Sequence, residues 1–209
     1  MSEGLRQELI ATALAMNASG INQGKSGNLS VRAEGGCLIT PSALPYDALE
    51  PEDIVLLDAH GVAHGRRAPS SEWSMHLAIL GARPEVAAVV HAHPTHATAL
   101  ACHGRGIPAF HYMVAVAGGR DIRCAGYATF GTTELAERTL EALVDRRACL
   151  LAHHGLVALG DSPAAALALA VEVETLARQY WHALQLGEPP RLDDAEMDRV
   201  LVKFQSYGR

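Results

Sequence analysis

The stretch that most constrains the fold is Val86–His96, which reads Val-Ala-Ala-Val-Val-His-Ala-His-Pro-Thr-His. It begins with a short apolar run rich in valine, a pattern typical of a buried strand. His91 and His93 follow directly. Because side chains alternate across a strand, the two imidazoles face one side, about 6–7 Å apart at the backbone. Pro94 then ends the ladder. We therefore expect a buried strand that presents two histidines at its exit.

Two histidines on one face at the end of a buried strand indicate a metal site. The alternative is chance, because the chain carries 11 histidines in 209 residues. A metal would need a third ligand. A second apolar run, Ala148–Ala152, ends in His153-His154-Gly155 and is its best source. Adjacent strand residues face opposite sides, so one of these two histidines is expected to join the site.

Composition bounds the class of protein. A chain of 209 residues with 49% hydrophobic content fits one domain, residues 1–209, with a real core. The net charge of −6 and the lack of a basic block argue against nucleic acid as a partner. We find no signal peptide and no apolar run of membrane-spanning length. The four scattered cysteines lack a Cys-x-x-Cys pair, which favours a reducing, cytoplasmic location.

Three segments could bind an anion. Asn22–Arg32 has glycines that let its backbone N–H groups converge. Its Gly-Lys-Ser is not a nucleotide P-loop, because Gly20 and Gly24 are too close. Thr40–Tyr46 is a loop with hydroxyls. Pro69–Glu72 begins a helix, where free N–H groups favour negative charge. An ordinary turn and plain helix capping remain alternatives. A divalent ion beside such loops favours sugar-phosphate chemistry, with Glu72 as an acid within reach.

The remaining pattern alternates strands and helices. We expect further strands at Leu29–Arg32, Cys37–Thr40, Ile54–Asp58, Val62–His64, near Ile122–Cys124 and at Leu156–Leu159. Helices are expected before Gly20, after Glu72, at Thr95–Cys102 with Thr95 as its cap, at Thr132–Arg147, from Ser162 to about Leu186, and from Asp193 onward.

These motifs together resemble the class II aldolase/adducin family, and within it the L-fuculose-1-phosphate aldolases. The resemblance runs from Gly20 to Gly208 and is carried by Asn22–Arg32, Leu38–Ser42, Pro69–Trp73, Val89–His93, Ile107–Met113, Tyr127–Thr132, His153–Gly155 and Phe204–Gly208. It implies an α/β fold, a three-layer αβα arrangement with a central, largely antiparallel sheet. It also implies a homotetramer with active sites between subunits.

The resemblance assigns roles to individual residues. The implied ligands of one Zn²⁺ per subunit, or of another divalent ion, are His91, His93 and His154, the last because it directly precedes the glycine. Glu72 matches the acid/base carboxylate. Tyr112 matches a catalytic tyrosine presented to a neighbouring subunit, and the C-terminal Tyr207 matches one near that site.

The phosphate pocket departs from the family at two positions. Asn28, Ser42, Ser70 and Ser71 match phosphate-binding positions. Lys25 stands where relatives usually carry threonine, and it would add a cation or crowd the loop. Ala43 replaces a usual glycine, which is awkward if that backbone has a positive φ.

The implied reaction is reversible aldol cleavage of a ketose 1-phosphate to dihydroxyacetone phosphate and an aldehyde. Candidate substrates are L-fuculose 1-phosphate and 5-deoxy- or 5-methylthio-ribulose 1-phosphate. Alternatives are a 4-epimerase of the L-ribulose-5-phosphate type, for which Asp121 would be an acid if it is not a turn residue, and a sugar-phosphate dehydratase or decarboxylase. A non-catalytic adducin-like module would need neither the histidines nor Glu72.

Overall fold

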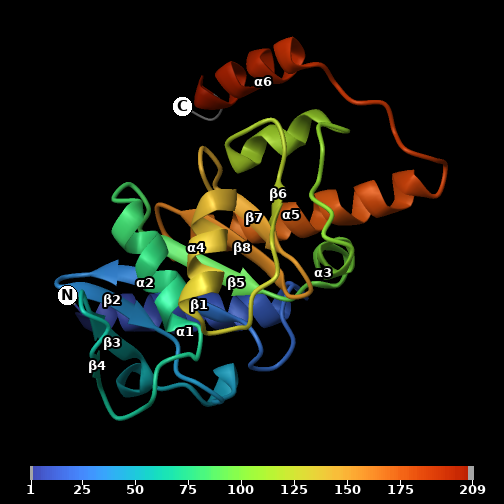
Figure 1. Cartoon of the computed structure of the whole chain (residues 1–209). Helices are drawn as coiled ribbons and strands as arrows, with labels where there is room; N and C mark the ends of the chain where they lie inside the picture. Colours follow the sequence, from blue (N-terminus) through green and yellow to red (C-terminus); the bar gives the residue numbers. More distant parts are fainter. Residues whose placement is uncertain (1, 207–209) are drawn as a thin grey trace.

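A single eight-stranded sheet organises the chain, in the order β4-β3-β2-β1-β5-β8-β7-β6. The computed structural model describes residues 2–206 (Figure 1). The strands are β1 (Asn28–Ala33), β2 (Gly36–Ile39), β3 (Val55–Asp58), β4 (Ala63–His64), β5 (Ala88–Ala92), β6 (Arg123–Ala125), β7 (Ala148–Leu151) and β8 (Gly155–Gly160). Every expected strand is present, and all pairings are antiparallel except β6 with β7. The sheet is thus mixed, with one parallel edge pair.

Helices pack on both faces of the sheet (Figure 1). They are α1 (Ser2–Ala18), α2 (Trp73–Ala82), α3 (Thr95–Cys102), α4 (Thr133–Ala142), α5 (Pro163–Leu184) and α6 (Asp194–Ser206), with 3₁₀ turns η1 (Tyr46–Ala48), η2 (Pro51–Asp53) and η3 (Tyr112–Ala117). One apolar core joins the sheet to α1, α3, α5 and α6, and a second joins it to α2 and α4.

The alternation of β5 decides which face carries the site. Ala88, Val90 and Ala92 belong to the core of α1, α3 and α5, and Val89 belongs to the core of α2 and α4. His91 is two residues after Val89 and therefore faces α2 and α4. This places the predicted ligands on the same side of the sheet as Glu72, which precedes α2.

Two helix ends differ from expectation. Thr132–Arg147 does not form one continuous helix, because α4 stops at Ala142 and Asp145 takes a left-handed φ of 55° that cannot continue it. Thr95 does not cap α3. Instead the carboxylate of Glu174, from α5, accepts the backbone N–H groups of His96 and Ala97 at 2.9 and 2.8 Å. A tertiary contact thus replaces the local cap.

Within residues 2–206, every helix is too short or too polar to cross a lipid bilayer. Tyr207 lies outside the described residues.

Candidate metal centre and active site

Four side chains converge at the exits of two buried strands. The Nε2 atoms of His91 and His93 lie 2.9 Å apart. The carboxylate of Glu72 reaches His91 Nε2 at 3.1 Å and His154 Nε2 at 3.3 Å. One ligand atom from each of the four residues lies within 4.8 Å of every other. The structure therefore brings together the three predicted histidines and Glu72 as a group that could hold a metal ion.

The histidines present lone pairs inward. His91 Nδ1–H donates to the carbonyl of Leu156 at 2.8 Å, which leaves the Nε2 lone pair for a ligand. Burial, with the neighbouring His91 ring second, lowers the pKa of His93 to about 3 and that of His154 to about 4. Neutral imidazoles are the form that coordinates a metal.

Glu72 supplies the oxygen of the set. Burial alone would raise its pKa, but His91, His154 and an amide hydrogen bond from Asn28 hold that pKa well below its usual range. Its Oε1 atom is buried and accepts no hydrogen bond from the described residues. An orphaned buried carboxylate oxygen facing three imidazole nitrogens is the environment that a divalent cation satisfies.

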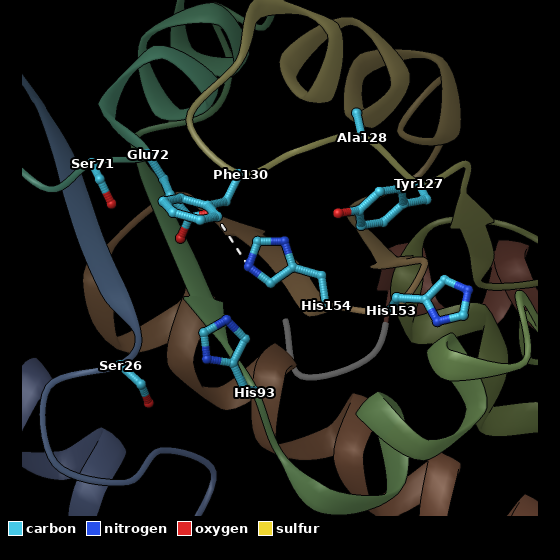
Figure 2. A pocket seen from close by; sticks show the side chains of 9 residues that line it. All are labelled: Ser26, Ser71, Glu72, His93, Tyr127, Ala128, Phe130, His153 and His154. Carbon is cyan, nitrogen blue, oxygen red and sulfur yellow. Dashed lines mark ion pairs between the residues drawn. The ribbon is translucent and has the colours of Figure 1, made fainter.

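Backbone geometry separates the two adjacent histidines. His153 has a left-handed φ of 55°, so the chain turns between β7 and β8 and sends the two side chains in different directions. His154 joins the metal group, whereas the His153 ring lies 5.8 Å from the Tyr127 ring (Figure 2). Gly155 permits this turn to pack: a Cβ there would lie 2.4 Å from the Ala92 carbonyl oxygen. The requirement for glycine explains why the third ligand precedes one.

A cavity of about 450 Å³ opens beside the group. Figure 2 shows side chains from several loops around it, with the Tyr127 hydroxyl pointing inward. It is lined by Ser26, Ser71, Glu72, His93, Tyr127, Ala128, Phe130, His153 and His154. Tyr127 and Phe130 are 56% and 63% exposed. The cavity thus combines a polar floor with an aromatic rim.

Of the predicted phosphate residues, one, Ser71, lines the cavity directly. Ser70 is buried, and its Oγ accepts the Glu72 N–H at 3.3 Å. The loop of Ser42 is joined to the loop of Ser70 by backbone hydrogen bonds from Ser42 N–H to Ala68 and from Ser70 N–H to Thr40.

Lys25 and Ala43, the two positions that differ from the residues usual in the family, contact each other. Lys25 Nζ donates to the carbonyl of Ala43 at 3.0 Å and so links the two predicted phosphate loops. Ala43 has a φ of 61°, the left-handed conformation that makes alanine costly. Asn28 is buried, and its amide nitrogen donates to Glu72 Oε2 at 2.9 Å.

Two further candidates lie away from the metal group. Tyr112 is half exposed on η3 and lines a different cavity, between η3 and α6. Asp121 is paired with Arg146 at 2.7 Å and Arg123 at 3.8 Å. These ion pairs favour a structural role for Asp121.

Sequence reasoning missed several residues. Ser26, Tyr127, Phe130 and His153 line the cavity although no role was assigned to them. His76, on α2, is fully buried and bonds to Asn28 and Ser30. The sequence offered two indications of this. His76 lies among apolar residues of α2, and Asn28 and Ser30 are polar residues two apart on β1.

Comparison with known proteins agrees with this geometry. The family described as class II aldolase and adducin N-terminal domain matches residues 7–181. A 5-methylthioribulose-1-phosphate/5-deoxyribulose-1-phosphate aldolase of Rhodospirillum rubrum is 57% identical over 98% of this chain and 92% of that protein. An L-fuculose phosphate aldolase of Escherichia coli K12 is 48% identical over 98% of this chain and 95% of its own.

A solved structure of an L-fuculose 1-phosphate aldolase superposes with a TM-score of 0.94 at 42% identity, covering 98% of each chain. The fold, the matched length and the group of Glu72 with three histidines all support the same family assignment. This chain belongs to the class II aldolase and adducin family, as one of its metal-dependent aldolases.

Proposed function

We propose that this protein reversibly cleaves a ketose 1-phosphate to dihydroxyacetone phosphate and an aldehyde. The observation that carries the proposal is Glu72 beside His91, His93 and His154, at the floor of a cavity with serines on one side. Relatives at 57% and 48% identity are named as aldolases of such substrates.

Zn²⁺ is the cofactor that we propose. Three imidazole nitrogens and one carboxylate form a borderline donor set that zinc prefers, and an acid that can leave provides an open position. Held by His91, His93 and His154, the ion would act as a Lewis acid at the substrate's C2 carbonyl.

The chain's own residues then divide the work. A base removes the proton of the C4 hydroxyl, the C3–C4 bond breaks, and its electron pair stays with the three-carbon fragment while the aldehyde leaves. Glu72 takes up a proton as the substrate binds and delivers it to C3 of that fragment, which gives dihydroxyacetone phosphate, and the base then releases the proton it took to solvent. Lys25, Asn28, Ser42, Ser70 and Ser71 are the proposed phosphate contacts. Ser71 is the one that lines the cavity directly.

The base that we propose is Tyr112 of a neighbouring copy in a homotetramer. In its own chain Tyr112 lies away from the metal cavity and is half exposed on η3. Tyr207 is proposed to approach the same neighbouring site. The test mixes two inactive variants, Tyr112→Phe and Glu72→Gln, after dissociation and reassembly. Shared sites would restore part of the activity, whereas mixtures with no activity would refute this assignment.

The aldehyde half is proposed to be small and largely apolar. The aromatic rim of Tyr127 and Phe130 suits a methyl or methylthio end better than a polyhydroxylated one. This places 5-methylthio- and 5-deoxy-ribulose 1-phosphate ahead of L-fuculose 1-phosphate.

The deciding experiment is a coupled assay of dihydroxyacetone phosphate release from these three ketose 1-phosphates, with and without a chelator. Release that the chelator abolishes and zinc restores supports the proposal. A metal-loaded protein that converts a substrate to a single isomer, with no fragments, would instead show a 4-epimerase.

A further inference from the structure

Behind Glu72, on the α2 face of the sheet, a line of buried polar groups runs through Asn28, His76 and Ser30. Asn28 Nδ2 lies 2.9 Å from Glu72 Oε2. His76 Nε2 lies 2.5 Å from Asn28 Oδ1, and Ser30 Oγ lies 2.7 Å from His76 Nδ1. Ser30 and His76 are fully buried, and Asn28 is 4% exposed. If one of these buried groups lost its hydrogen-bond partner, it would be left unsatisfied, which is unfavourable.

The direction of every hydrogen bond in this line follows from its end. An ionised Glu72 can only accept, so Asn28 must point its NH₂ group toward the carboxylate. Asn28 Oδ1 then faces His76, whose Nε2 must carry the proton. The other nitrogen of the neutral ring is an acceptor, so the Ser30 hydroxyl must donate to it. Burial first, then His91, lowers the pKa of His76 to about 3, which agrees with a neutral ring.

The sequence places these groups with two simple periodicities. Asn28 and Ser30 are two residues apart on β1 and share a face. His76 is four residues after Glu72, one turn along the start of α2. Asn28 is also paired with His91 across β1 and β5. Strand β1 and the start of α2 thus hold the Glu72 carboxylate next to His91, one of the histidines of the metal group.

We propose that His76, with Ser30 bonded to its Nδ1, is a positioning residue that fixes the Asn28 amide and thereby the orientation of Glu72. This inference rests on the proposed proton-transfer role of Glu72. With His76 absent, Asn28 Oδ1 has no donor and the amide is no longer held from behind, so its hydrogen bond no longer fixes the orientation of the Glu72 carboxylate. Outer groups that orient an active-site ligand commonly contribute a factor of about 10–100 in activity or metal affinity.

The test compares His76→Leu, which removes both hydrogen bonds, with His76→Gln, whose amide can still donate to Asn28 and accept from Ser30. At saturating zinc we expect His76→Leu to lower kcat by about 10–100-fold with little change in KM, and His76→Gln to restore most of it. Ser30→Ala should give a smaller loss of kcat, because the ring still donates to Asn28 and only its Nδ1 loses a partner.

Thr139→Val is the matched control for packing. Thr139 is also fully buried, on α4, and its hydroxyl donates to the Leu135 carbonyl at 2.7 Å and to the Met75 sulfur of α2 at 3.7 Å. Its replacement should leave kcat unchanged in the folded protein. A folded His76→Leu variant with the kcat of Thr139→Val would overturn the positioning role, as would a loss that His76→Gln does not restore.

Two readouts do not need turnover. In the zinc-loaded protein, ¹⁵N NMR of the imidazoles should show His76 neutral with its proton on Nε2 at pH 7, and Ser30→Ala should keep this tautomer, because Asn28 Oδ1 still requires a donor. The zinc dissociation constant should rise about tenfold in His76→Leu and recover in His76→Gln. A proton on Nδ1, or unchanged zinc affinity, would contradict the inference. A wild type that releases no dihydroxyacetone phosphate refutes the proposed function while these two readouts still judge the positioning.

Discussion

At the scale of single residues, His153 and His154 show how one backbone dihedral separates two identical side chains. We expect His154→Ala to lose bound metal and activity, because it removes one of the nitrogens beside Glu72. His153→Ala is the matched control, since its ring faces Tyr127 and should leave the metal content unchanged. Elemental analysis of both purified variants checks this. Equal metal in the two would refute the ligand assignment.

Glu72 is the second residue whose role a single substitution tests. Glu72→Gln keeps the size of the side chain and removes its ability to carry a proton to carbon, so kcat should fall by about 10²–10⁴-fold. Glu174→Gln serves as the control, because that carboxylate caps α3 and does not line the cavity. The comparison uses turnover of zinc-loaded protein. Normal turnover by Glu72→Gln with zinc bound would exclude the proton-transfer role.

At the scale of elements, the start of β8 depends on the missing side chain of Gly155. A Cβ there would lie 2.4 Å from the Ala92 carbonyl oxygen and 2.7 Å from the His93 ring. We expect Gly155→Ala to destabilise the protein by about 1–3 kcal/mol, because strands β5 and β8 must move apart.

Gly81 provides the opposite case within the same fold. It lies in α2 with open space around it. Gly81→Ala should therefore stabilise the protein by about 0.5–1 kcal/mol, because a helical glycine carries an entropy cost. Urea unfolding of the two variants measures both effects, and a Gly155→Ala variant as stable as the wild type would contradict the packing described for β8.

The η2 turn carries a prediction about pH. Asp53 is buried, and hydrogen bonds from Arg66 first, then from Arg67 and the Glu50 N–H, outweigh burial and hold its pKa well below the ordinary 3.8. A carboxyl whose pKa is lower in the folded state stabilises folding above its unfolded pKa, and this stabilisation is lost as pH falls toward the folded value.

Asp53→Asn should therefore cost about 1–3 kcal/mol at pH 7 and clearly less at pH 3. Urea midpoints at the two pH values give the comparison. Asp47→Asn, an exposed acid in η1, is the control and should change little at either pH. A constant difference between wild type and Asp53→Asn across this range would be inconsistent with the lowered pKa.

At the scale of the whole molecule, metal binding and folding are linked. An ion that binds the folded chain at 100 times its dissociation constant adds about 2.7 kcal/mol of stability. For a chain of this length, removal by a chelator should lower Tm by roughly 5–10 °C. Thermal scans with and without chelator measure the shift. His154→Ala should show no shift, and an equal shift in that variant would place the ion elsewhere.

The sequence by itself determined the elements of this protein and most of its site. The valine run before His91, the His-x-His spacing and the glycine after His154 each act locally, through side-chain alternation and steric limits on the backbone. These patterns could therefore be recognised directly in the amino-acid sequence. The strands, the His91–His93 pair and a third ligand from His153 or His154 were predicted from them, whereas the choice of His154 and the acid/base role of Glu72 came from the family resemblance.

Only the tertiary structure decided what depends on contacts between distant segments. Glu174 rather than Thr95 caps α3, because α5 passes its N-terminus. His76 reads as a core position in the helical pattern, and its role emerges only when β1 brings Asn28 and Ser30 against it. The periodicity of a sequence shows which face of a helix or strand is buried. It does not show which polar atom of a distant segment will contact that face.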